Sequence, residues 1–204
     1  MLGSSQDSLP IMEMFYTIQG EGHHTGRAAV FVRTSGCEVG CVWCDVKESW
    51  NIDTKQYKSV LSITEEIANY KTDFVVITGG EPLMHDLSKL TQSLKGKGYE
   101  IAIETSGTEL KTGAIDWYCF SPKKFKKPLD EAYCLANELK IIINHPSDFN
   151  WAEKHAKKVN SNCLLYLQPE WEKQERFLPL IIEYVKNNPK WKISLQTHKF
   201  MNIP

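Results

Sequence analysis

The chain has 204 residues, of which 42% are hydrophobic and 24% are charged. This composition fits a globular protein with one well-buried core, and the length is short for two independent domains. The 24 Lys and Arg residues nearly balance the 25 Asp and Glu residues, so the formal net charge is -1. This removes the overall positive field typical of nucleic-acid-binding proteins. We therefore expect one domain over residues 1–204 and no nucleic-acid partner.

The amino-terminal region carries no recognisable targeting signal. Residues 1–10 lack the basic and apolar segments of a secretory signal, and no apolar run approaches the roughly 20 residues that a membrane span needs. We expect a cytoplasmic protein without a membrane partner, in which residues 1–12 are an extension that is either disordered or not native.

Short apolar segments rich in strand-forming residues recur along the chain. They predict strands at 29–34, 74–78, 100–104, 117–121, 139–143, 163–167 and 192–195. Several are apolar at nearly every position, which is typical of parallel strands covered on both faces. Helices are expected between them, with a capping box at Ser62–Glu65, a cap at Asp86 before Leu87, Leu90 and Leu94, and further helical segments at 148–160 and 172–187.

This alternation of strands and helices predicts an α/β fold with a mostly parallel sheet. A complete eight-unit barrel takes about 250 residues, so a chain of 204 residues predicts an incomplete, trimmed βα barrel. Polar and glycine-rich segments follow the predicted strands at 36–37, 79–82, 105–107, 121–123 and 168–169. We expect the active site there, because α/β folds place their sites at the carboxyl ends of the strands.

Three of the six cysteines, Cys37, Cys41 and Cys44, lie within eight residues after the first predicted strand. A [4Fe–4S] cluster would use all three thiolates and leave one iron open. A zinc site would need a fourth ligand, for which His23 or His24 is a candidate, and a redox pair would leave Cys37 without a role. The spacing favours the iron–sulfur cluster, and the zinc site and the redox pair remain as alternatives. The remaining cysteines are expected to be small core residues: Cys119, Cys134 and Cys163.

The cysteine spacing and the sequence Thr78-Gly79-Gly80-Glu81-Pro82 together resemble the cluster loop and the GGE segment of radical S-adenosylmethionine (SAM) enzymes. Within that superfamily the chain is similar to the 7-carboxy-7-deazaguanine synthase family from about Glu13 to its last residue. The similarity is carried by residues 15–22, 26–27, 31–33, 44–45 and 196–199 and by the terminal Pro204.

The resemblance implies a cluster held by Cys37, Cys41 and Cys44, and SAM bound to its open iron. It also implies that the reaction is hydrogen abstraction from C6 of 6-carboxy-5,6,7,8-tetrahydropterin, ring contraction and loss of ammonia, a lyase step of queuosine biosynthesis. A flavodoxin or ferredoxin as electron donor and a homodimer are implied as well. The implied SAM-binding residues are Trp43, Gly79, Gly80, Glu81, Ser106, Ser121, Lys123 and Gln168.

The implied substrate-binding residues are those suited to a pterin with one carboxylate. Gln19 and Glu21 can accept hydrogen bonds from its N–H edge, and Arg33, on the same strand face as Phe31, can pair with the acid group. Thr78, His198 and Pro204 join this set only through the resemblance.

One position departs from the family. Where the family commonly has a hydroxyl residue that holds magnesium, this chain has Val46, which offers no side-chain oxygen to the ion. Asp45 or Ser49 could substitute for it. We expect modest magnesium dependence at most.

Two other functions remain open at this stage. A radical SAM enzyme that activates a glycyl-radical partner would need an open groove for a protein, whereas Gln19, Glu21 and Arg33 suit a small polar substrate. A zinc-stabilised binding module without catalysis would have no use for the glycine-rich turn at 79–82.

Overall fold

The computed structural model describes residues 7–204, and within them one nine-stranded sheet carries the fold. The strand order is β3-β1-β2-β4-β5-β6-β7-β8-β9. The strands are β1 Ser8–Ile18, β2 Ala28–Thr34, β3 Tyr57–Ser59, β4 Phe74–Gly79, β5 Glu100–Thr105, β6 Trp117–Phe120, β7 Glu138–Ile143, β8 Leu164–Pro169 and β9 Trp191–Ile193. The α-helices are α1 Val60–Ile67, α2 Ser88–Gly96, α3 Asp130–Leu135, α4 Asp148–Ala156, α5 Gln174–Asn187 and α6 Thr197–Met201.

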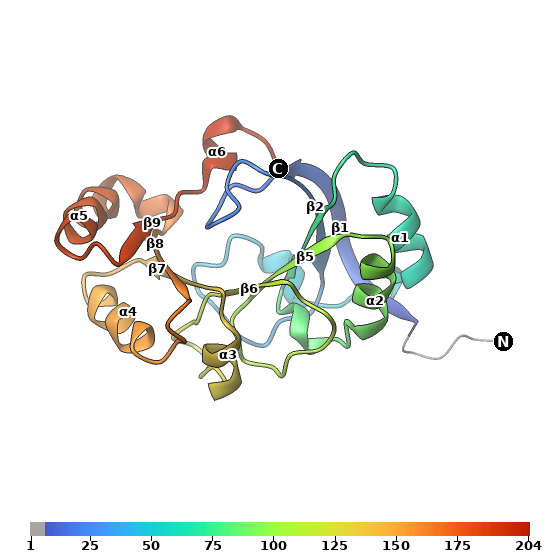
Figure 1. Ribbon diagram of the computed structural model, residues 1–204, viewed down its shortest axis with the longest axis horizontal. Coiled ribbons are helices and arrows are strands. Elements are labelled where there is room, and N and C mark those ends of the chain that lie inside the picture. Colours follow the sequence, from blue (N-terminus) through green and yellow to red (C-terminus); the bar gives the residue numbers. More distant parts are fainter. Residues whose placement is uncertain (1–6) are drawn as a thin grey trace.

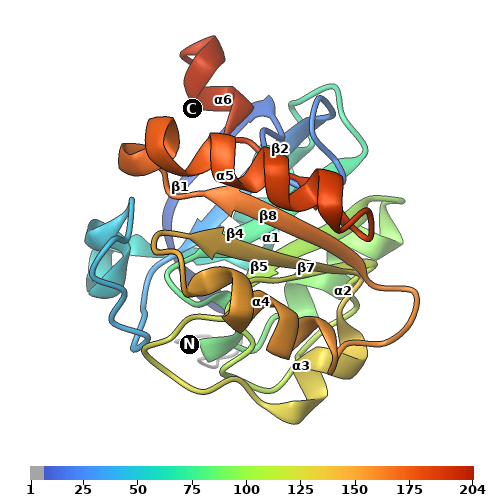
Figure 2. The same ribbon diagram turned by 90° about the vertical axis from the view of Figure 1, so that its left-hand side faces the viewer.

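The sheet curves like a barrel but stays open. From β2 through β4 to β9, each strand is parallel to its neighbours in the sheet, whereas β1 is antiparallel to both β2 and β3. Figures 1 and 2 show the sheet bent around a central space, with α1, α2, α4 and α5 on its outer side. The edge strands β3 and β9 do not pair with each other, so the predicted incomplete βα barrel is confirmed.

The parallel strands are apolar on both faces, as their sequences predict. On the outer face, Val75, Ile77 and Ile103 belong to the large core that also contains Leu90 of α2 and Phe177 of α5. A smaller apolar layer fills the inner face near the amino ends of the strands: Ala29, Phe74, Val76 and Ala102. Each large side chain buried this way stabilises the fold by about 1.5 to 3 kcal/mol.

The loop between β1 and β2 closes the amino end of the barrel. The Arg27 guanidinium lies 4.0 Å from the centre of the Phe74 ring and pairs with Glu100 at 2.6 Å. His23 stacks on Trp117 with ring centres 4.6 Å apart, and His24 packs against the Phe74 and Trp117 rings. Both histidines lie at the start of the parallel strands, whereas the cysteines follow the end of β2. The idea that His23 or His24 completes a zinc site with the cysteines is therefore wrong.

Several elements differ from prediction. Strands β1 and β3 were not predicted, and because Ser8–Met12 belong to β1, that part of the expected disordered extension is wrong; residues 1–6 lie outside the described residues. Helices α3 and α6 were not predicted either. Cys134 is exposed on α3 rather than in the core, whereas Cys119 and Cys163 are buried.

Two helix starts also differ from prediction. Helix α1 is capped by Ser59, whose hydroxyl accepts from the Ser62 amide at 3.1 Å, so the capping box at Ser62–Glu65 does not form. Asp86 does accept from the Ser88 amide at 2.9 Å, one residue before the cap position of α2. No helix within residues 7–204 combines the length and apolar character needed to cross a bilayer.

Candidate active site

A cavity of about 460 Å³ lies at the carboxyl ends of the parallel strands. Its size is that of a small-molecule site. The loop after β2, the β1–β2 loop and the carboxyl-terminal segment also contribute to its wall. Every residue predicted for the cluster, SAM or substrate lines this one cavity: Gln19, Glu21, Arg33, Cys37, Cys41, Trp43, Cys44, Thr78, Gly79, Gly80, Glu81, Ser106, Ser121, Lys123, Gln168, His198 and Pro204.

The three cysteines form one side of the cavity and none of them is in a disulfide. Burial raises the pKa of the Cys41 thiol to about 11, against the opposing charge of Lys123. Within the described residues, no three His, Cys, Asp or Glu side chains are grouped closely enough to hold one metal ion. Three free thiols at the wall of one cavity are a donor set that suits a [4Fe–4S] cluster with one iron left open.

The glycine pair Gly79–Gly80 at the end of β4 fixes the position of the cysteine loop. The Gly80 amide donates to the Thr34 carbonyl at 3.1 Å, and the Glu81 amide donates to the Gly36 carbonyl at 2.8 Å. A Cβ atom on Gly80 would lie 2.2 Å from the Gly36 carbonyl oxygen and 2.8 Å from the Cys37 Cβ. Glycine is required here because the backbone approaches the cysteine loop so closely.

Glu81 is buried, with 1% of its surface exposed, rather than an exposed acid on a turn. Its Oε1 accepts from the Thr105 hydroxyl at 2.6 Å and from the Leu83 amide at 3.2 Å. Its Oε2 accepts from the amide of Ser106 at 2.8 Å and from the hydroxyl of the same residue. The carboxylate thus joins the ends of β4 and β5 behind the cavity wall, and Ser106 contacts it directly.

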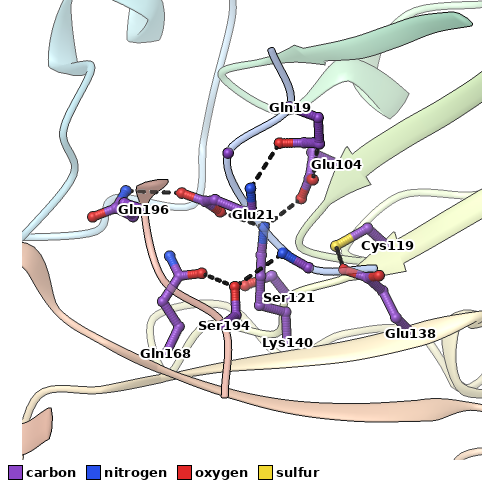
Figure 3. Close-up of polar contacts among 12 residues, drawn as sticks. Gln19, Glu21, Glu104, Cys119, Ser121, Glu138, Lys140, Gln168, Ser194 and Gln196 are labelled. Carbon is purple, nitrogen blue, oxygen red and sulfur yellow. Dashed lines mark hydrogen bonds and ion pairs between the residues drawn. The ribbon is translucent and has the colours of Figure 1, made fainter. Parts of the chain in front are cut away.

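The opposite side of the cavity is formed by charged side chains from strands β5 and β7 and from the β1–β2 loop. Lys140 on β7 lies between Glu21 and Glu104, with Cys119 and Glu138 on one side and Gln168 and Ser194 on the other (Figure 3). Its Nζ donates to Glu21 Oε2 at 2.5 Å and to Glu104 Oε2 at 2.8 Å. We call Glu21, Glu104 and Lys140 the buried triad.

Burial and charge act in opposite directions on the two acids of the buried triad. Burial alone would raise the pKa of Glu21, but Lys140 and the hydrogen bond from Gln196 lower it to about 2. The pKa of Glu104 is raised, because its burial and the nearby charge of Glu21 outweigh the attraction of Lys140. The pKa of Glu104 is therefore higher than that of Glu21, so Glu104 is the acid that is protonated first as the pH falls.

The carboxyl-terminal segment connects the buried triad to the cysteine loop. Gln196 donates to Glu21 Oε1 at 2.8 Å, and the Lys199 ammonium pairs with Asp45, next to Cys44, at 2.9 Å. The Thr17 hydroxyl donates to the Pro204 backbone oxygen at 2.9 Å. This segment is held on both sides of the cavity.

The remaining predicted residues have partners at the cavity wall. Arg33 donates to Glu13 at 2.6 Å, and Gln168 accepts from the Ser194 hydroxyl at 2.6 Å. Lys123 donates to the Ser121 hydroxyl at 2.6 Å, and its Nζ lies 5.4 Å from the centre of the Trp43 ring.

The candidate magnesium ligands do not form a magnesium site. Val46 lines the cavity but offers no side-chain oxygen. Asp45 is engaged by Lys199 and Gln196. Ser49 is buried, donates to the Val46 carbonyl at 2.7 Å and does not line the cavity. Of the two candidate ligands only Asp45 lines the cavity, and Lys199 already pairs with its carboxylate.

Sequence reasoning missed Glu104 and Lys140, which lie at the centre of the cavity floor. Their segments were interpreted as apolar strands, and the acids and the lysine within them were not weighed. A charged residue inside a strand buried on both faces needs a partner, and in β7 the inward positions alternate as Glu138, Lys140 and Ile142. That alternation was the available signal.

The family of the chain follows from its matches to known proteins. A sequence profile of the Radical SAM superfamily matches residues 31–160, which include the cysteine loop and most of the parallel strands. Together with the open βα barrel and its three cysteines, this match defines the protein as a radical SAM enzyme.

Individual relatives show to which family of radical SAM enzymes the chain belongs. A 7-carboxy-7-deazaguanine synthase from Flavobacterium psychrophilum is 55% identical over 97% of this chain and 94% of the relative, and one from Synechocystis sp. is 45% identical over 96% and 94%. The crystal structure of QueE from Escherichia coli matches with a TM-score of 0.82 at 33% identity, covering 92% of this chain and 93% of that one. The chain belongs to the 7-carboxy-7-deazaguanine synthase family, which favours this lyase over the activating-enzyme and zinc-module alternatives.

Proposed function

We propose that this protein converts 6-carboxy-5,6,7,8-tetrahydropterin into 7-carboxy-7-deazaguanine with loss of ammonia, a step of queuosine biosynthesis. The observation that carries the proposal is that three free cysteines and a layer of acids and amides face each other across one cavity. A site that only bound zinc, or one that docked a protein segment, would not need both.

Cys37, Cys41 and Cys44 would hold the [4Fe–4S] cluster, and the glycine pair Gly79–Gly80 would bring backbone groups against the bound SAM. When bound, the cluster and SAM supply a radical that abstracts hydrogen. The chain itself binds and orients both ligands and excludes water from them. The other proposed SAM contacts are Trp43, Glu81, Ser106, Ser121, Lys123 and Gln168.

The residues opposite the cysteines would bind the pterin. Glu21 stays ionised because Lys140 and Gln196 lower its pKa, so it can accept hydrogen bonds from the N–H edge together with Gln19. The Arg33 guanidinium now pairs with Glu13, whose side chain is the more exposed of the two. It would bind the substrate carboxylate in place of Glu13. Thr78, His198 and Pro204 would complete this side.

The family of the enzyme also supports a proposal for its cellular location, oligomeric state and electron donor. The protein would act as a single cytoplasmic domain over residues 1–204 and as a homodimer, and a flavodoxin or ferredoxin would supply the electron. Magnesium would have at most a minor part, since Asp45 and Ser49 already have partners within the chain. Nucleic acid is not expected to bind.

Metal analysis of anaerobically purified protein tests the proposal first. We expect about four irons and four sulfides per chain, lost when Cys37, Cys41 or Cys44 is replaced by alanine and retained in Cys134→Ala, because Cys134 is exposed and outside the cavity. Incubation of the reduced protein with SAM and 6-carboxy-5,6,7,8-tetrahydropterin should then release ammonia and 7-carboxy-7-deazaguanine. One zinc per chain and no cluster after reconstitution would refute the proposal.

A further inference from the structure

The ammonium of Lys140 is the cation that contacts both carboxylates of the cavity floor. Only 5% of its side chain is exposed, and its two carboxylate contacts, at 2.5 and 2.8 Å, go to groups that both line the cavity. Glu138, on the same strand, lies further from the cavity. It accepts instead from the His23 amide, the Trp117 indole and the Cys119 thiol. Glu138 thus has its own donors, whereas the two cavity acids share Lys140.

We propose that Lys140 is a positioning residue of the substrate site: it holds Glu21 and Glu104 as two fixed hydrogen-bond acceptors for the donor-rich edge of the pterin. This inference rests on the proposed function and adds to it a residue that does not itself have to touch the substrate. It also assigns Glu104 to the acceptor edge beside Glu21.

Stability alone does not explain the buried triad. A buried ion pair often contributes less than apolar side chains of similar volume, because removing the charges from water costs several kcal/mol. The outer face of the same strand is apolar at Leu139 and Ile141, so β7 packs well without charge. A triad whose two acids face a ligand-sized cavity instead fits a role in binding.

Glu21 depends on Lys140 for its orientation because it lies in a loop rather than on a strand. Its carboxylate is fixed at two points, Lys140 on one oxygen and Gln196 on the other. Glu104 lies on β5, and besides Lys140 it is contacted by the Gln19 amide nitrogen at 3.5 Å and by the Cys119 thiol. Without Lys140, neither carboxylate would have a cationic partner, and the two acids would face each other.

Loss of the ammonium should also change the charge of the acids. Two carboxylates close together in a buried site cannot both stay ionised easily, so one takes up a proton. The group that takes it is Glu104, because burial already raises its pKa and Lys140 opposes this. A protonated Glu104 has one acceptor oxygen fewer for the substrate. Binding would then improve as the pH rises and the proton leaves.

Other charged or titratable groups face the buried triad and set the background of any pH profile. They are Cys119 on β6, Glu138 on β7, Lys123 in the loop after β6, Asp45 beside Cys44 and His198 in the carboxyl-terminal segment. Apart from burial, the charge of Lys140 contributes a downward shift to the pKa of Cys119, Lys123 and His198, so a substitution at Lys140 shifts these groups as well. A second substitution at Glu104 separates the two causes, because only the pH dependence carried by Glu104 then disappears.

The test compares Lys140→Met and Lys140→Arg with the wild type in equilibrium binding of 6-carboxypterin, a fluorescent oxidised analogue, from pH 6 to 8. We expect Lys140→Met to bind at least ~10-fold more weakly at pH 7, the scale of one lost charge-assisted contact, with affinity rising toward pH 8. In turnover assays of Lys140→Met, KM should rise by a larger factor than kcat falls. Lys140→Arg should keep the wild-type pH profile, because the charge is retained. Lys192→Met, on β9, two strands away from β7 and outside the cavity, is the matched control.

A double variant keeps the test informative if Lys140→Met does not fold. Lys140→Met combined with Glu104→Gln leaves no unpaired second acid, so it should fold and bind weakly with little dependence on pH. Wild-type affinity and pH profile in a folded Lys140→Met protein would overturn the inference. So would equal loss in Lys140→Met and Lys192→Met.

The result separates this inference from the proposed function. If the wild type neither binds the probe nor converts the tetrahydropterin, the proposed function fails. Thermal unfolding of Lys140→Met and wild type across the same pH range still tests the charge arrangement. The variant should lose more stability than the wild type as the pH rises, because Lys140 no longer opposes the raised pKa of Glu104. Identical unfolding profiles would then reject the role of Lys140.

Discussion

The two sides of the cavity are built by different means. The cysteine side is a loop whose position depends on backbone contacts with the turn at Gly79–Gly80. The floor is centred on Lys140 and Glu104, which project from strands held by the sheet, and Glu21 of the β1–β2 loop pairs with Lys140. The loop side concentrates its functional residues within a few sequence positions. The floor gathers Glu21, Glu104 and Lys140 from distant parts of the chain. Substitutions should therefore affect cluster retention on one side and ligand affinity on the other.

The largest expected effect comes from Glu81→Ala on the cysteine side. The change removes an acceptor from buried donors of Thr105, Ser106 and Leu83, so we expect the free energy of unfolding to fall by about 3 kcal/mol. Urea unfolding of the cluster-free protein measures it. Glu109→Ala is the matched control, because Glu109 is partly exposed and pairs with Lys126; it should cost less than about 1 kcal/mol. Equal losses would contradict the role of Glu81 as the link between β4 and β5.

Gly80→Ala should have the next largest effect. The added methyl group would meet the Gly36 carbonyl and Cys37, so the loop must shift at a cost of about 2 kcal/mol. Less iron should remain bound after reconstitution and gel filtration than in the wild type. Gly96→Ala is the control, since a methyl group there meets nothing within 4 Å and should stabilise α2 by up to about 1 kcal/mol. Full iron content in Gly80→Ala would show that the close approach is not needed.

A smaller effect should come from a group outside both sides of the cavity. Burial lowers the pKa of His155 on α4 to about 4, so the folded state binds a proton less readily than the unfolded state. Its contribution to stability is present above pH 6.5 and is lost as the pH falls toward 4. We expect His155→Gln to reduce the fall in unfolding free energy between pH 6.5 and 5, by less than about 1.4 kcal/mol per pH unit. Parallel curves for the variant and the wild type would contradict this assignment.

The smallest expected effect is that of magnesium. Because Asp45 is paired with Lys199 and position 46 has no hydroxyl, activity should fall only modestly after treatment with a chelator. Titration of activity against added magnesium measures this. An absolute requirement with tight affinity would show that the ion displaces Lys199 from Asp45.

The same contrast explains what the sequence could predict. The cysteine loop and the glycine turn were predictable because their residue types and spacing are local, and the continuous apolar strands predicted the open barrel. The role of Lys140 could not be predicted from the sequence, because its partners Glu21 and Glu104 lie 119 and 36 positions away. Strand β1 was missed because buried and partly exposed residues are mixed along its length, without the continuous apolar character of the parallel strands.

The contact between Gln196 and Glu21 spans 175 positions of sequence, and this distance bears on how the enzyme matures. During synthesis the cysteine loop leaves the ribosome long before the segment that closes the other side of the cavity. The cavity wall that faces the three thiols is therefore complete only when the last residues of the chain have folded onto the sheet.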